Sequence, residues 1–130
     1  MDAEHAEQEL ERIKTLEGRI QRNEGRLDAL REAAANIRSI GSREAISQLA
    51  DLEAMTRTDI TKLEHARDKL CSMISSIDDE TCREVLLLRY VRCLNFYEIS
   101  DQMSYSLGMV HRIRRKALKL MQQRLEHETT

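Results

Sequence analysis

Apolar residues recur at every third or fourth position between residues 13 and 37, which is the spacing of one face of an α-helix. A seam with this spacing is typical of a coiled coil, so this helix is expected to pair with a second helix. Asn23 lies on the seam. A buried amide there would fix the register or the number of partners, whereas an amide at an exposed edge would do neither, and both interpretations stay open. The seam comprises Ile13, Leu16, Ile20, Asn23, Leu27, Leu30, Ala34 and Ile37.

A second long helix is predicted between Ser42 and about Ile77. Gly41 supplies the residue that commonly ends a helix, and Ser42 can cap the next one, so a short antiparallel turn is expected. The apolar stripe of this helix is wider than a two-stranded seam needs, which indicates more than one neighbour. Thr56 and Asp59 interrupt the stripe, which predicts a poorly packed middle. The stripe comprises Ile46, Leu49, Leu52, Met55, Ile60, Leu63, Leu70, Met73, Ile74 and Ile77.

A third helix is predicted from Asp79 to about Arg92. Aspartate is a good N-cap, and Thr81 with Glu84 has the spacing of a capping box. Arg89 and Arg92 are left over for solvent or phosphate. The apolar surface expected on this helix comprises Cys82, Val85, Leu86, Leu88 and Val91.

Two helix starts and one tight turn lie between residues 94 and 121, which predicts a helix-turn-helix. Asn95 and Glu98 have the spacing of a capping box, and Ser106 can cap a second helix after the break at Ser104 and Tyr105. On that second helix the residues expected to pack are Val110, Ile113, Ala117, Leu120 and Met121. Those expected on the opposite side, within an arc of roughly 100°, are Gly108, His111, Arg112, Arg115, Lys119 and Gln122.

The outward stripe suits the major groove of DNA, where arginine can bind guanine and lysine can meet phosphate. The alternative is a solvated basic face, which is common on helices. Gly108 can let the backbone approach the groove closely. The predicted DNA-contacting residues are Ser106, Gly108, His111, Arg112, Arg115, Lys116, Lys119, Arg89 and Arg92, and the predicted oligomerisation residues are Ile13, Leu16, Ile20, Asn23, Leu27, Leu30 and Ile37.

Composition and charge agree with this organisation. The chain has 130 residues, no proline, 34% charged residues and 3% aromatic residues, which favours an all-α fold. Acidic residues outnumber basic ones by 18 to 12 in residues 1–82, whereas basic residues outnumber acidic ones by 9 to 3 in residues 83–124. Only the C-terminal part is therefore expected to contact a polyanion.

Other classes of function are not expected. The three cysteines (Cys71, Cys82 and Cys93) form no Cys-x-x-Cys pair, so neither a metal nor a cofactor is predicted, and their odd number fits a cytoplasmic protein. No apolar window reaches the roughly 20 residues of a membrane helix, so membrane association is not expected. The scattered histidines, and the absence of a glycine-rich phosphate loop, argue against an enzyme, and no small-molecule substrate is expected.

The segment EVLLLRYVRCLNFYEISDQMSYSLGMVHRIRRKALKLM resembles region four of the bacterial sigma-70 family, over about residues 79–125. Its "LRY", "EI", "YS" and "KAL" elements are most similar to small phage late transcription regulators of the ArpU and RinA type, which carry a coiled-coil arm ahead of the helix-turn-helix. The resemblance implies promoter DNA as a partner and RNA polymerase as a possible one. Ser104 departs from the glycine frequent at the turn, and Leu107 and Gly108 replace polar base readers.

The sequence therefore predicts an all-α protein with a long N-terminal antiparallel helical hairpin followed by a three-helix helix-turn-helix domain. The expected parts are an oligomerisation arm (1–77), a DNA-binding domain (78–126) and a tail (127–130), with residues 1–6 frayed. The expected function is sequence-specific DNA binding by a transcription regulator that dimerises through its arm. A small terminase-like packaging subunit, or a helical adaptor that binds RNA polymerase without DNA, stays open as an alternative.

Overall fold

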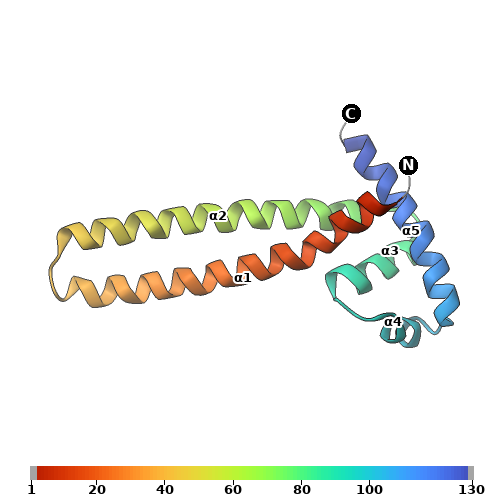
Figure 1. Ribbon diagram of the computed structural model, residues 1–130, viewed down its shortest axis with the longest axis horizontal. Coiled ribbons are helices and arrows are strands. Elements are labelled where there is room, and N and C mark those ends of the chain that lie inside the picture. Colours follow the sequence, from red (N-terminus) through yellow and green to blue (C-terminus); the bar gives the residue numbers. More distant parts are fainter. Residues whose placement is uncertain (1–2, 129–130) are drawn as a thin grey trace. The chain divides into compact units, whose positions relative to one another are not determined.

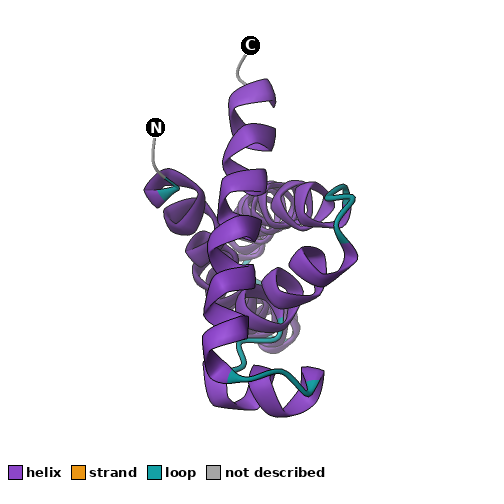
Figure 2. Ribbon diagram, turned by 90° about the vertical axis from the view of Figure 1, so that its right-hand side faces the viewer, coloured by secondary structure: helices purple, strands orange, loops and turns teal. Residues whose placement is uncertain are grey.

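The computed structural model describes residues 3–128, and within this range the chain forms five α-helices, one π-helical turn and no strand. The predicted all-α class, with a helical hairpin at the N-terminus, is confirmed (Figures 1 and 2). In order, the elements are α1 (Glu4–Arg38), α2 (Arg43–Ser75), α3 (Glu80–Leu86), η1 (Leu87–Val91), α4 (Phe96–Met103) and α5 (Leu107–Glu128).

The chain divides into two compact units. The first, here called the head unit, comprises Met1–Thr15 with Arg67–Thr130, and the second, the hairpin unit, comprises Leu16–Ala66. This division differs from the expected boundary between residues 77 and 78, because the first turns of α1 and the last turns of α2 pack with the helix-turn-helix. Whether residues 78–126 form a domain that folds alone stays a prediction.

The turn of the hairpin unit is built as the sequence predicts. Gly41 has a φ of 82°, in the left-handed region that favours glycine, and its amide donates to the carbonyl of Ile37 at 3.1 Å. The amide of Ala45 then donates to Oγ of Ser42 at 3.3 Å, which caps α2. Figure 1 shows α1 and α2 running side by side from this turn, and an ion pair between Arg31 and Glu53 at 3.2 Å joins them.

The interior of the hairpin unit departs from the prediction on α2. Thr56, expected to interrupt the packing, is only 4% exposed, because its hydroxyl donates to the carbonyl of Leu52 at 2.8 Å and so needs no water. Met55, expected in the apolar stripe, is 64% exposed, and Leu52 is exposed as well. A two-helix hairpin covers only one side of each helix, so the rest of a wide stripe remains outside.

The start of α1 is ordered, contrary to the fraying expected for residues 1–6. Met1 and Asp2 lie outside the described residues, but Glu4–Ala6 are helical and the Ala6 and Leu10 side chains are fully buried. The amide of Ala6, which has no partner within its own helix, donates to Oε1 of Gln122 at 3.0 Å. A residue of the last helix therefore caps the first one. At the other end, α5 extends through Glu128, so His127 and Glu128 of the expected tail are helical.

The third helix begins at its predicted cap but ends irregularly. Oδ1 of Asp79 accepts the amide of Cys82 at 3.0 Å, so the cap is Asp79 and not the expected pair of Thr81 and Glu84. The helix then widens into η1, where the amide of Arg92 donates to the carbonyl of Leu87 at 3.0 Å. Tyr90 is buried in this turn, whereas Val91, predicted to pack, is exposed.

Candidate nucleic-acid interface

The helix-turn-helix forms at the predicted residues, and its caps fix both helix starts. Oδ1 of Asn95 accepts the amide of Glu98 at 2.9 Å, and the Glu98 carboxylate accepts the amide of Asn95 at 3.0 Å, which completes the capping box. Ser104 closes α4 in the left-handed conformation with a φ of 58°. Oγ of Ser106 then accepts the amide of Met109 at 3.1 Å and starts α5. Ser106 therefore acts as the predicted cap, exposed at the end of the helix.

A small apolar core holds α5 against the preceding helices. This core consists of Val85 of α3, Leu88 of η1, Ile99 of α4 and Val110 of α5, all of them at most 1% exposed. The core is completed by partly buried neighbours, which are Leu94, Phe96, Met103 and Ile113. Because Val110 anchors the first turns of α5 in this core, the opposite side of α5 must face outward.

That outward side carries most of the predicted DNA-contacting residues. Gly108, Arg112, Arg115 and Lys119 are exposed, and in the described part of the chain none of the three cationic groups has a hydrogen-bond or ion-pair partner. Side chains spaced by three and four residues lie along one stripe of a helix. The three cationic residues, Arg112, Arg115 and Lys119, are here called the basic stripe. Its charges are fully available to an anionic ligand.

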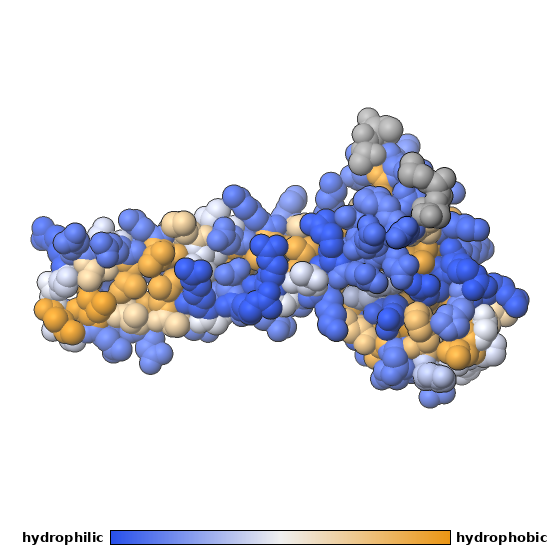
Figure 3. Space-filling model, viewed as in Figure 1, coloured by the Kyte–Doolittle hydropathy of each residue, from blue (hydrophilic) through white to orange (hydrophobic). Residues whose placement is uncertain are grey.

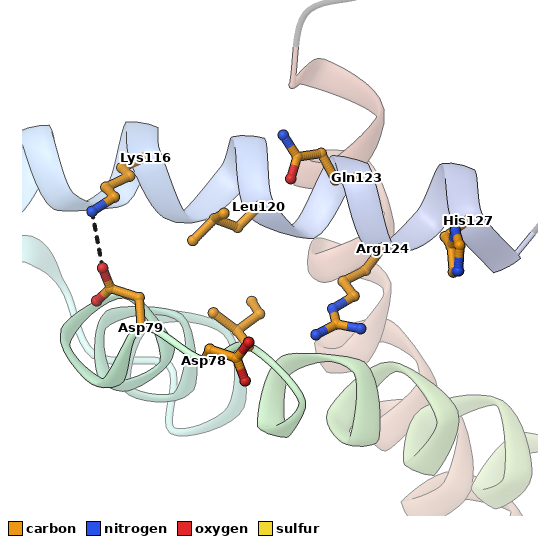
Figure 4. Close-up of a pocket in the computed structure, with 8 residues that line it drawn as sticks. Asp78, Asp79, Lys116, Leu120, Gln123, Arg124 and His127 are labelled. Atoms are coloured by element: carbon orange, nitrogen blue, oxygen red, sulfur yellow. Dashed lines mark hydrogen bonds and ion pairs between the residues drawn. The ribbon is translucent and has the colours of Figure 1, made fainter.

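Lys116 lies beside the stripe but is already engaged. Its ammonium group forms an ion pair with Oδ2 of Asp79 at 2.9 Å, seen as the dashed line in Figure 4. The amide of Cys82 and this lysine lower the pKa of Asp79 from 3.8 to about 2, and the carboxylate in turn raises the pKa of Lys116. Lys116 therefore ties α5 to the start of α3, and sequence reasoning could not foresee this contact with a residue 37 positions away.

The Phe96 ring contacts two more of the predicted DNA-contacting residues, His111 and Arg89. The His111 ring lies 4.6 Å from the Phe96 ring, centroid to centroid, and the Arg89 guanidinium lies 4.5 Å from the same centroid. Arg89 also donates to the carbonyl of Leu94 at 3.1 Å. Both residues are partly buried, in contrast to the exposed Arg92. Arg89 and His111 thus help to hold the turn while part of each stays accessible.

Arg114 is a residue of this region that the sequence did not single out. Its guanidinium forms an ion pair with Glu7 of α1 and lies 5.4 Å from the Phe96 centroid. The hydroxyl of the neighbouring Tyr90 is buried and has no hydrogen-bond partner among the described residues. Burial raises the pKa of that hydroxyl, and the nearby Arg114 charge partly offsets this effect. Arg114 is therefore turned toward α1, although it lies in sequence between the exposed Arg112 and Arg115.

Gln122 corrects the prediction for the outward face of α5. It was expected on the exposed side, but it is buried, with its oxygen bonded to the amide of Ala6 and its nitrogen donating to Glu126 at 3.2 Å. Leu118 is buried as well, although it was not assigned to the packing face. Leu118 lies one turn from Arg114 and one turn from Gln122, which contact Glu7 and Ala6 at the beginning of α1. We attribute the wider buried face in the second half of α5 to this neighbour.

The predicted oligomerisation residues are largely covered within a single chain. Ile13, Leu16, Ile20 and Leu27 are buried, whereas Asn23, Leu30 and Ile37 are half-buried. The large apolar side chains that stay exposed in the hairpin unit are others, namely Ile40, Leu52 and Met55. Figure 3 shows apolar surface over the turn end of the hairpin.

One cavity of about 510 Å³ lies in the head unit between α5 and the segment that joins α2 to α3 (Figure 4). Asp79 with Lys116 forms one end of its lining, and Arg124, which donates to the carbonyl of Ser76 at 2.8 Å, lies further along α5.

The described residues offer no sign of a reactive thiol at Cys82, because burial raises the pKa of this thiol to about 11. Among the described residues, no group of three or more His, Cys, Asp or Glu side chains could hold a metal ion. None of the helices in the described range is long and apolar enough to cross a membrane.

Comparison with known proteins finds one family model that is similar to the helix-turn-helix. Residues 79–123 match the model of Sigma-70, region 4. The match begins at the Asp79 cap and ends within α5, so it spans the core, the turn and the basic stripe. These residues therefore form a sigma-70 region 4-like helix-turn-helix of the DNA-binding class. No curated protein and no solved structure matches the chain.

Proposed function

We propose that this protein is a sequence-specific transcription regulator that binds duplex DNA through α5. The observation that carries the proposal is the basic stripe. Arg112, Arg115 and Lys119 project from the second helix of a helix-turn-helix on the side opposite its core, and none of them is neutralised by the described residues. A helix of this kind fits the major groove, where the cations can reach both base edges and phosphates.

Salt dependence of binding tests the electrostatic part of this proposal. If each subunit neutralises about four to six phosphates, the logarithm of affinity falls with the logarithm of salt at a slope of roughly −0.9 per phosphate. Fluorescence anisotropy on a labelled duplex, titrated from about 50 to 200 mM salt, should then show a loss of more than about a hundredfold. An affinity that stays flat over this range would mean that the stripe is only a solvated surface.

The roles within the stripe are expected to differ along the helix. Arg112 and Arg115 lie nearer the start of α5 than Lys119, within the turns that enter the groove, so Arg112→Ala should cost on the order of 1–3 kcal/mol on the preferred site and reduce the difference in affinity between that site and random DNA. Lys119 lies further along, so Lys119→Ala should weaken binding to both duplexes alike. Arg22→Ala, an exposed arginine on α1, serves as the control and should leave both affinities unchanged.

We extend the proposal to dimerisation through the arm. The seam of α1 is mostly occupied within the chain, so a dimer would use the exposed side of the hairpin unit together with the half-buried Asn23, Leu30 and Ile37. Two hairpins that pair through this side would form a four-helix bundle, in which the wide stripe of α2 finds its second neighbour. The size of the assembly also separates functions, because a dimer favours regulation and a ring of many subunits favours DNA packaging.

The biological setting rests on resemblance. The arm ahead of a region 4-like module resembles the phage late regulators of the ArpU and RinA type, so we propose a cytoplasmic regulator of phage or mobile-element genes. Because sigma-70 region 4 belongs to proteins that work with RNA polymerase, contact with RNA polymerase is part of this proposal. An adaptor that binds RNA polymerase without DNA would show none of the salt-dependent DNA binding described above.

A further inference from the structure

The outward face of α5 changes character along its length. Its charged residues begin only at Arg112, whereas the first turn carries Leu107, Gly108 and Met109. Met109 is 38% exposed, and Tyr105, just before the helix, is 40% exposed. The end of α5 that enters a groove first is therefore apolar and uncharged.

The turn before α5 holds this apolar end in a fixed position. The amide of Tyr105 donates to the carbonyl of Ser100 at 3.2 Å, and the hydroxyl of Ser100 donates to the carbonyl of Tyr105. One residue thus bonds both backbone groups of Tyr105. Because Ser106 then caps α5 through the amide of Met109, the first turn is anchored by its backbone and its side chains are free to face a ligand.

Gly108 has no explanation in the local fold. It lies on the same stripe as Arg112, Arg115 and Lys119, and a Cβ added there would meet no heavy atom within 4 Å. Glycine in a regular helix costs about 1 kcal/mol relative to alanine. The presence of glycine at this position is explained if the helix backbone lies close to the base edges of the groove here, because any side chain would then be in the way.

Met109 lies about 60° around the helix from Arg112, one turn nearer the start of the helix. A thioether side chain cannot pair with phosphate, and its exposure shows that the core does not require it. The one apolar group that the base pairs present in the major groove is the 5-methyl group of thymine, which apolar side chains recognise by contact. Guanine, in contrast, is the usual partner of arginine.

We propose that the first turn of α5 reads thymine, with Met109 and the open surface at Gly108 packing on the 5-methyl group while Arg112 reads a neighbouring guanine. The inference rests on the proposed function, since it names what the same interface recognises. It predicts a target in which at least one thymine is recognised by its methyl group and not by hydrogen bonds. Continuity with the basic stripe supports DNA as the occupant, because the charges that follow hold the helix against phosphates.

Replacement of thymine by uracil tests the inference directly. The probe is a duplex selected by the protein from a random library, in which each thymine is replaced by uracil in turn, so that only the methyl group is lost. One or two positions should bind about fourfold more weakly, which corresponds to the ~0.8 kcal/mol of one buried carbon group. If the parent duplex binds in a salt-dependent manner but no uracil substitution matters, the inference is wrong and the proposed function stands. If no duplex is bound at all, both are wrong.

A double-mutant cycle then assigns the contact to its side chain. Met109→Ala should weaken binding to the parent duplex by a similar factor, and in this variant the sensitive uracil substitution should have no further effect. A uracil penalty of the same size in wild type and in Met109→Ala would assign the methyl contact to another residue and overturn this part of the inference.

Gly108→Ala tests the close approach of the backbone. The added methyl group has open space in the free protein, so thermal stability should hold or rise, whereas DNA affinity should fall by at least about tenfold because the methyl group would collide with the base edges. Gly25→Ala is the matched control, since a Cβ at this exposed helical glycine of α1 also meets nothing within 4 Å. It should gain the same helix propensity without any change in DNA binding. Wild-type affinity of Gly108→Ala would exclude the close approach.

Discussion

The head unit and the hairpin unit are both helical, but they solve the problem of burying apolar surface differently. In the head unit, helices from both ends of the chain enclose a core, and polar contacts such as Glu7 with Arg114 and Ala6 with Gln122 join residues more than 100 positions apart. In the hairpin unit two helices share one seam, and large side chains such as Ile40 and Met55 stay outside. The comparison indicates that the head unit closes a core with contacts between distant segments, although Tyr97, Tyr105 and Met109 stay exposed on it. The hairpin unit has no third helix within its own range to cover its outer side, and this is the surface proposed above for a second copy.

The first prediction compares the same substitution in the two units. Leu86 of the head unit is fully buried, so Leu86→Ala should destabilise it by about 2–5 kcal/mol through lost contacts and a residual cavity. Leu30 of the hairpin unit is half-buried, so Leu30→Ala should cost only about 1 kcal/mol. Urea denaturation of both variants measures the difference. Equal losses would mean that the hairpin unit is packed as densely as the head unit.

A second prediction asks whether the exposed side of the hairpin unit joins two copies. Light scattering at tens of micromolar should give the mass of a dimer for the wild type and of a monomer for the double variant Ile40→Asp with Met55→Asp. The expected loss of association free energy is on the order of 2–4 kcal/mol, because two carboxylates would be buried in an apolar contact.

The control for that experiment is Ala50→Asp, which adds the same charge to an exposed position about 140° around α2 from Met55. This variant should remain a dimer. A wild type that is already monomeric, or a dimer that tolerates both aspartates, would contradict the assignment of this surface.

A third prediction concerns the contact that closes the head unit. Gln122→Ala removes the acceptor of the buried Ala6 amide and should destabilise the protein by about 1–3 kcal/mol, since that donor would lose its partner out of reach of water. Gln123→Ala, at the exposed neighbouring position, should have almost no effect. Thermal unfolding distinguishes the two variants. Equal stability of both would show that the start of α1 does not depend on Gln122.

The smallest expected effect is electrostatic. The pKa of Asp79 is lowered from 3.8 to about 2, so its charge stabilises the folded state above the unfolded pKa, and this contribution disappears as the pH falls through about 2. Asp79→Asn keeps a capping side chain but removes the charge. The midpoint of thermal unfolding should therefore be lower for Asp79→Asn near neutral pH, and should converge with that of the wild type by about pH 2.

Asp78→Asn provides the comparison for that experiment, because Asp78 is the exposed neighbour and forms none of the Asp79 contacts. It should show little pH-dependent difference from the wild type. If Asp78→Asn and Asp79→Asn follow the same pH profile, the ion pair with Lys116 contributes nothing in solution.

Much of the fold could be predicted from the sequence because its signals act over a few residues. The capping box of Asn95 and Glu98, the cap at Ser106 and the left-handed Gly41 are interactions within one turn of chain, and all three form as predicted. The exposed positions of Arg112, Arg115 and Lys119 also follow from helical periodicity once Val110 is known to pack.

The sequence by itself thus determined the helices, the turn and the side of α5 that faces outward, because caps and periodicity are local. Only the tertiary structure decided which polar residues of a helix form contacts within the protein and which stay exposed. Lys116 contacts Asp79, Arg114 contacts Glu7 and Gln122 contacts Ala6 at the start of α1, although all three are polar residues of the same helix, α5. Thr56 is buried where Met55 is not. These outcomes depend on which distant segment covers each side of a helix, and no pattern within a helix specifies its partner.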